Sequence, residues 1–150
     1  VENTFAWYGE NVGAKWCYHD DFWVDTDGEV AEIMTTSAWY PPIELIQHIY
    51  KICSELDSEC EIDGDYENEA TTPIGGFAIN KNGFEHEEYD DEIEYPDEEN
   101  YENDEGELDD ESYDNAMEEY YERVANLRSE MKSLAHNNLI NKLESETTEG

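Results

Sequence analysis

Basic residues are the scarcest class in this sequence. Its 150 residues include 7 Lys+Arg against 42 Asp+Glu, which gives a formal net charge of -35 at pH 7. A surface of this sign repels nucleic acid and anionic membranes, so direct binding to either is not expected. Solubility alone needs only about 2–8 charges on a small domain. The excess of acid therefore favours a partner that is itself basic.

Long apolar runs and targeting signals are missing as well. No stretch approaches the roughly 20 apolar residues of a membrane span, and no signal peptide is visible. The chain begins with Val1, which is expected where an initiator methionine or a longer leading segment has been removed. We expect a protein that does not bind membranes and that acts in the cytoplasm.

Cysteine is too sparse to form a zinc or redox motif. Cys17, Cys53 and Cys60 make an odd number, and no C-x-x-C occurs. We expect reduced, mostly buried thiols. Cys17 and His19 alternate along an expected strand, but two ligands do not make a zinc site.

Catalytic and nucleotide-binding motifs are not found. The chain has no P-loop, no G-x-G-x-x-G and no G-x-S-x-G. The stretch 59–70 places Gly64 at the sixth position of an EF-hand loop, but Ala70 stands where the bidentate glutamate belongs. The sequence therefore predicts a protein that is not an enzyme and has no cofactor and no specific metal site.

Aromatic residues are abundant, at 13% of the chain, which separates it from disordered acidic tails. All Trp and Phe lie in residues 1–84, with 17 acids, whereas residues 85–122 hold 21 acids and no Lys or Arg. This change in composition predicts four parts. They are an α+β domain at 1–84, an acidic linker or partner-binding segment at 85–111, an amphipathic helix at 112–144 and a frayed tail at 145–150.

The first part alternates strand and helix signals. Pro41-Pro42 precedes a helical apolar spacing over 43–56, and Asp-Gly and Asn-Gly pairs mark two hairpin turns. The expected strands are Thr4–Tyr8, Lys15–Val24, Glu29–Ala38, Glu59–Tyr66, Phe77–Ile79 and Phe84–Tyr89, with a loop at Thr72–Gly76. The fold class is therefore α+β, a small antiparallel sheet with one covering helix.

Three motifs in this part resemble a phage- and plasmid-borne ferredoxin-like domain of unknown function. They are Tyr8-Gly9 with Gly13-Ala14-Lys15-Trp16, then Thr36-Ser37-Ala38-Trp39-Tyr40-Pro41-Pro42, then Gly75-Gly76-Phe77-Ala78. The resemblance covers about residues 8–84. It implies a partial ferredoxin-like fold, because only about seven residues precede the first motif, and a phage or mobile-element origin. It implies no catalytic residues.

The C-terminal part has a short heptad seam. Tyr120, Val124, Leu127, Met131 and Leu134 follow a 4-3-4-3 spacing, after which the register slips at Asn138. Ser112 or Asp114 is the expected N-cap. One alternative for function is therefore a structural or assembly protein that forms a homodimer through this helix.

The acidic segment gives the preferred hypothesis. Dense carboxylates can imitate the phosphates of DNA, and interspersed tyrosines are typical of binding surfaces rather than solvating tails. We predict a DNA-mimic inhibitor that binds a basic nucleic-acid-binding protein of the host, such as a defence factor. The residues predicted to contact this partner are Glu87, Glu88, Asp90, Asp91, Glu92, Glu94, Tyr95, Asp97, Glu98, Glu99, Tyr101, Glu102, Asp104, Glu105, Glu107, Asp109, Asp110 and Glu111.

Overall fold

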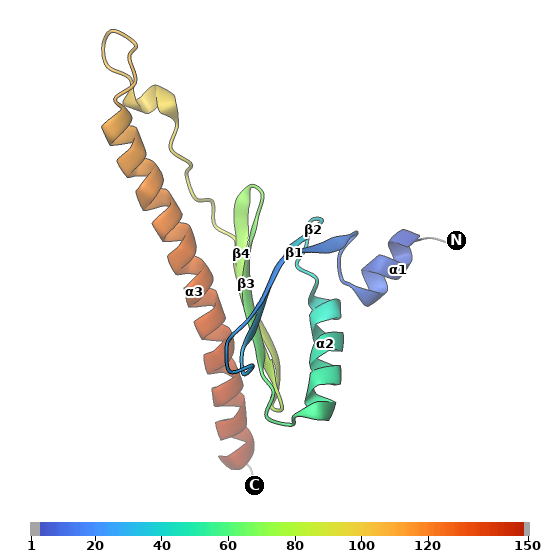
Figure 1. The fold of residues 1–150 in the computed structure, drawn as a ribbon. Helices are drawn as coiled ribbons and strands as arrows, with labels where there is room; N and C mark the ends of the chain where they lie inside the picture. The colour runs from blue at the N-terminus through green and yellow to red at the C-terminus, as the bar shows by residue number, and fades with distance from the viewer. Residues whose placement is uncertain (1–3, 149–150) are drawn as a thin grey trace. The chain divides into compact units, whose positions relative to one another are not determined.

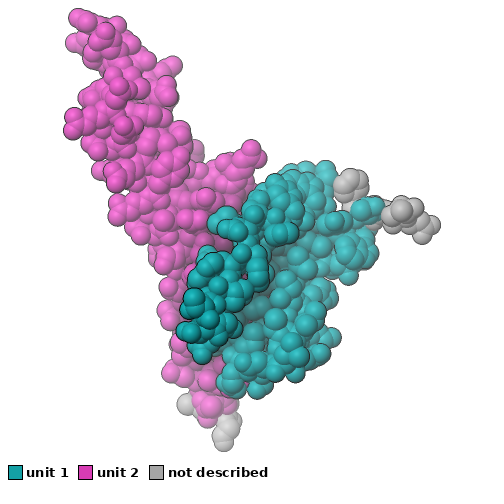
Figure 2. All heavy atoms as spheres, in the orientation of Figure 1, with its two compact units in different colours: residues 1–62 teal, residues 63–150 magenta. Residues whose placement is uncertain are grey.

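A computed structural model describes residues 4–148 of the chain, which divides into two compact units, 1–62 and 63–150 (Figure 2). The α+β class and the long C-terminal helix are confirmed. The strands form two separate sheets instead of the single sheet expected. The second sheet belongs to the unit of the C-terminal helix, so the division falls near residue 62 and not at residue 84.

Unit 1 contains two helices and a hairpin. These elements are α1 (Thr4–Asn11), β1 (Cys17–Val24), β2 (Ala31–Ser37) and α2 (Ile43–Leu56) (Figure 1). Strands β1 and β2 are antiparallel, as the sequence predicted, with Phe22 opposite Ile33. Both side chains are at least half exposed.

Helix α1 corrects the prediction of a strand at Thr4–Tyr8. Five residues are too few to show whether the apolar period is two or 3.6. A strand also needs a neighbour for its backbone groups, whereas a helix satisfies them locally. Gly13, with φ +81°, ends the turn that follows α1, and its N–H donates to the Tyr8 carbonyl at 3.1 Å.

Unit 2 is a three-stranded sheet with a long helix across one face. Its elements are β3 (Ile62–Asn68), β4 (Thr71–Asn80), β5 (Gly83–Tyr89), the short 3-10 helix η1 (Glu98–Tyr101) and α3 (Asp110–Thr148). The strand order is β3-β4-β5, and α3 runs along β4 and β5 (Figure 1). The predicted turn at Asn80–Gly83 joins β4 to β5.

Strand β4 includes Thr72–Gly76, which the sequence placed in a loop. Its two adjacent glycines allow close approach and do not mark a turn. A Cβ on Gly75 would lie 2.2 Å from the ring of Tyr66, and one on Gly76 would lie 2.1 Å from the Lys132 backbone nitrogen. The glycines thus let a ring cover one face of the strand and α3 press against the other.

Helix α3 is longer at both ends than the predicted 112–144. Asp109 is the cap in place of Ser112 or Asp114, since its carboxylate accepts from the Ser112 N–H at 3.3 Å and from the hydroxyl at 2.7 Å. Residues 145–148 are helical instead of frayed, and 149–150 lie outside the described residues. Within residues 4–148, no helix is long and apolar enough to cross a membrane.

The predicted heptad seam packs on the chain's own sheet. Tyr120, Val124 and Met131 are buried and Leu127 is half-buried. Leu134 was wrongly placed in the seam, because its side chain is 39% exposed and Ala135 is fully buried in its place. The buried face continues through Leu139, which packs with Ala78 of β4. A straight helix on a sheet keeps about 3.6 residues per turn, so a strict heptad register drifts off its face.

Candidate partner-binding surface

The acidic segment 85–111 follows a defined path along unit 2. Its first residues form the end of β5, up to Tyr89. Ile93 then packs against the core formed by Ile74, Tyr120 and Val124. Asp97 begins η1 by accepting a hydrogen bond from the Glu99 N–H at 3.2 Å. The acids of this segment therefore project from an ordered backbone.

Side-chain hydrogen bonds also order the second half of the segment. The side-chain amide oxygen Oδ1 of Asn103 accepts from the backbone N–H groups of Glu105 and Glu107, each at 2.9 Å. Glu102 and Leu108 form an isolated antiparallel bridge that closes this turn. Short polar side chains of this kind stabilise turns by binding nearby backbone groups. The turn exposes its three glutamates to solvent.

The first turns of α3 extend the acidic surface beyond the predicted site. Asp110, Asp114, Glu118 and Glu122 recur every four residues and are all exposed; we call these four residues the acid stripe. Residues four apart share one face of a helix, so these carboxylates lie in a row. Asp110 belongs to the predicted site, whereas Asp114, Glu118 and Glu122 were not predicted, although their spacing in the sequence could have revealed them.

The acids from 90 to 122 are not compensated inside the molecule. They number 18, and none forms an ion pair with any residue of the described range 4–148. Within this range Asp97 and Asp109 still accept hydrogen bonds as caps of η1 and α3, and two residues of the predicted site that precede the range are also held by the fold. Glu87 accepts from the Asn138 amide at 2.6 Å, and Glu88 accepts from the Tyr66 hydroxyl, so both are engaged by the fold. The free surface therefore begins near Asp90.

Tyrosines gather where the acidic segment meets α3. The Tyr95 ring lies edge-to-face with Tyr120, with centroids 5.0 Å apart, and Tyr101 pairs in the same way with Tyr113 at 5.8 Å. The nearby Tyr95 hydroxyl raises the pKa of Tyr121. Of these rings, Tyr95 remains 53% exposed, so an anchor predicted from the sequence is available to a partner.

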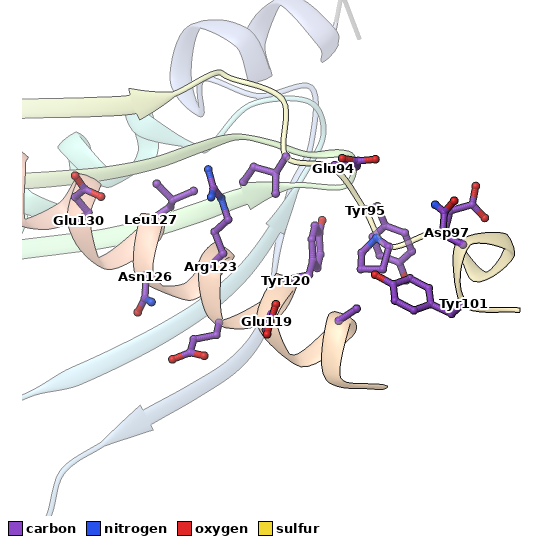
Figure 3. A pocket seen from close by; sticks show the side chains of 15 residues that line it. Glu94, Tyr95, Asp97, Tyr101, Glu119, Tyr120, Arg123, Asn126, Leu127 and Glu130 are labelled. Atoms are coloured by element: carbon purple, nitrogen blue, oxygen red, sulfur yellow. The ribbon is translucent and has the colours of Figure 1, made fainter. Parts of the chain in front are cut away.

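An open groove of about 810 Å³ separates the acidic segment from α3. Figure 3 shows Tyr95 and Tyr101 on the side of the segment and Tyr120, Arg123 and Leu127 on the helix. The lining contains five carboxylates and one basic side chain. This groove was not predicted, because it depends on the path of residues 93–101 alongside a helix that comes later in the chain.

The later turns of α3 are charge-paired with the sheet. Lys132 pairs with Asp65 at 3.3 Å and Lys142 with Glu85 at 3.2 Å, and His136 Nε2 lies at the hydrogen-bond distance of 2.7 Å from Asp63. Arg123 differs from these bases, because it makes no ion pair or hydrogen bond with any residue in 4–148. The one base that lines the groove thus forms no ion pair with the carboxylates around it in the described chain.

A polar network on the sheet is the arrangement that most resembles catalytic chemistry. The Tyr66 hydroxyl lies 2.5 Å from His86 Nε2 and also donates to Glu88. Desolvation, followed by the contact with Glu88, raises the pKa of Tyr66. The phenol stays protonated at neutral pH and is a poor nucleophile, so we assign it to holding β3 against β5 across Gly75.

The cysteines are free and half-buried. Desolvation raises the pKa of Cys17 and of Cys60, which disfavours the thiolate that reactions and metals require. Among the described residues, no group of three or more His, Cys, Asp or Glu side chains is placed to hold a metal ion.

Comparison of the chain with protein-family models, with curated proteins and with solved structures finds no match. The function therefore has to be argued from the charge, the exposure and the tyrosines of the acidic surface itself.

Proposed function

We propose that this protein binds a basic nucleic-acid-binding protein through residues 90–122 and inhibits it by imitating DNA. The observation that carries the proposal is the set of 18 acids without an ion pair in the described chain, presented on an ordered backbone. A disordered brush of acid would give solubility without such order. An ordered surface can match the fixed geometry of a phosphate-binding site.

The spacing of charge on α3 supports the imitation of DNA. Six acids lie between Asp110 and Glu122, a stretch of 13 residues. At a helix rise of about 1.5 Å per residue, this is about one negative charge per 3.3 Å of helix axis. One strand of DNA carries about one phosphate per 3.4 Å. A Lys/Arg surface built for phosphates would therefore meet a similar density of charge.

The partner that fits is a bacterial host protein, and the source of this chain is a phage or mobile element. This part of the proposal is what the resemblance expected from the three sequence motifs in residues 8–84 implies, and it is separate from the argument on the acidic surface. A nuclease or other defence factor, a nucleoid protein and a polymerase all carry the basic surface that the proposal needs. A charge of -35 also raises the rate at which a basic partner is met in solution.

The proposal is tested with a charge-neutralised variant of the full chain. Deleting the acidic segment is unsuitable, because Ile93 belongs to the core of unit 2. The variant neutralises the acid stripe through Asp110→Asn, Asp114→Asn, Glu118→Gln and Glu122→Gln. The control removes four exposed acids of unit 1 through Glu10→Gln, Asp27→Asn, Glu32→Gln and Glu55→Gln.

Each protein is immobilised, exposed to bacterial lysate and eluted with a salt gradient. We expect the wild type and the control to retain a nucleic-acid-binding protein that double-stranded DNA displaces. The stripe variant should release it at clearly lower salt, because each neutralised carboxylate removes a favourable charge contact and lowers the affinity. Equal elution from all three, or retention that DNA does not affect, would contradict the proposal.

The assembly alternative has weaker support. Its homodimer requires the apolar seam of α3, and that seam lies against the chain's own sheet. A dimer through the same face would have to open unit 2 first.

A further inference from the structure

The groove between the acidic segment and α3 has two kinds of wall. Tyr95 and Tyr120 give it an aromatic side, and Leu127 and Ile93 give it a partly apolar floor. Carboxylates stand around these residues, including Glu94, Asp97 and Glu119. Five acids against one base leave the lining strongly negative. Carboxylates would be enough to bind a cation, so the tyrosines indicate a second requirement. The groove suits a ligand that is cationic and also has a flat face that can stack on a ring.

We propose that this groove holds an extended, arginine-rich segment of the partner. The inference rests on the proposed function and identifies where part of the same partner binds. A guanidinium group is planar, is weakly hydrated and stacks on tyrosine while it hydrogen-bonds to carboxylate. Lysine offers a point charge that is more strongly hydrated. The groove should therefore distinguish arginine from lysine, whereas a purely electrostatic surface would not.

Arg123 gives this inference a signature. Its side chain lines the groove, and it forms no ion pair or hydrogen bond within residues 4–148. A cation entering the groove meets its repulsion. Removing the charge of Arg123 should therefore strengthen binding of a basic segment, although most changes at a binding site weaken it.

The test measures fluorescence anisotropy with a short labelled peptide in which arginine alternates with serine, at about 150 mM salt. Tyr95→Ser should weaken binding about fivefold to tenfold, through loss of the aromatic contact. Its control is Tyr40→Ser, the same change at an exposed tyrosine of unit 1. Both rings are more than half exposed, so neither change should unfold the protein.

Arg123→Gln should strengthen binding about threefold, and Lys51→Gln, an equal change of charge on α2, should leave it within a factor of about 1.5. The lysine version of the peptide should bind severalfold more weakly than the arginine version. Together these results would support the groove as the binding site.

Two results would overturn the inference in different ways. In the first, Tyr95→Ser binds the arginine peptide as tightly as the wild type does, and the arginine and lysine peptides bind with equal affinity, while the stripe variant loses the lysate partner. Charge alone then recognises the partner, and the proposed function stands without the groove. If the wild-type protein does not bind the peptide and the stripe variant also retains the lysate partner as firmly as the wild type, the groove and the proposed function both fail.

Discussion

Charged side chains of helix α3 are paired with the sheet in its second half and unpaired within the described chain in its first half. Beyond residue 128, its bases pair with acids on β3 and β5, and Ala135 and Leu139 pack on the sheet. Before residue 123, its carboxylates face solvent without a partner in the described chain, next to an acidic segment that adds more. One helix thus contains a half that stabilises the fold and a half whose charges oppose it.

This difference separates acids that stabilise the fold from acids that bind a partner in the proposed function. Like charges four residues apart destabilise a helix by about 0.2–0.5 kcal/mol per pair, and the acid stripe contains three such pairs in sequence. If stability alone decided the sequence, some bases would be expected among these acids, as Lys132 and Arg128 lie beside Asp65. The absence of such bases from 85–122 is what a binding requirement predicts.

The largest expected effect is a loss of packing between the sheet and the later half of α3, caused by a substitution at Gly76. Gly76→Val places side-chain atoms where the Lys132 backbone lies, so the helix must move away from the sheet. We expect unit 2 to lose more than about 4 kcal/mol of stability, or not to fold. Urea unfolding followed by circular dichroism measures this. Gly9→Ala, with no atom within 4 Å of the new Cβ, is the control and should not be destabilised.

The buried register of the later half is tested by two leucines. Leu139→Ala should cost about 3 kcal/mol, because Leu139 is 2% exposed and its removal leaves a cavity beside Ala78. Leu134→Ala should cost less than about 1 kcal/mol at its exposed site. The same unfolding experiment compares them. Equal losses would mean that the heptad predicted from the sequence, and not the face seen here, carries the packing.

These leucines also show how far the sequence could lead. Local signals predicted the β1–β2 hairpin, α2, the Asn80–Gly83 turn and most of α3, because each depends on neighbours in sequence. The strand at Thr72–Gly76 could not be predicted, since its glycines are explained only by Tyr66 and Lys132 from other elements. The acids and tyrosines of the site were found by composition. The groove and Arg123 were not, because they depend on two segments meeting in space.

The acid stripe should affect stability as well as binding. Neutralising it relieves three like-charge pairs, so we expect unit 2 to gain about 1 kcal/mol at low salt. The gain should shrink in high salt, where repulsion is screened. Urea midpoints at two salt concentrations measure it, with the unit 1 charge variant as control. A stripe variant less stable than the wild type would mean that these acids hold structure and are not reserved for a partner.

The smallest expected effect lies in the Tyr66 network, whose contribution to stability is present at neutral pH and is lost at high pH. The pKa of Tyr66 is raised in the folded protein, so its contribution is complete below the unfolded value of about 10 and is lost as pH rises above it. The cause is that the unfolded chain releases the proton while the folded protein still holds it between His86 and Glu88.

Tyr66→Phe should therefore be less stable than the wild type at pH 8, and the difference should narrow as pH rises above about 10. Every other tyrosine is the same in both proteins, so the difference between the two urea midpoints isolates Tyr66. The control is Tyr18→Phe, the same change at an exposed tyrosine of unit 1. If the gap between wild type and Tyr66→Phe stays constant through this range, the phenol is not held protonated by the sheet. The network would then be open to water like the acids beyond it, and the boundary between paired and free carboxylates would lie before Glu88.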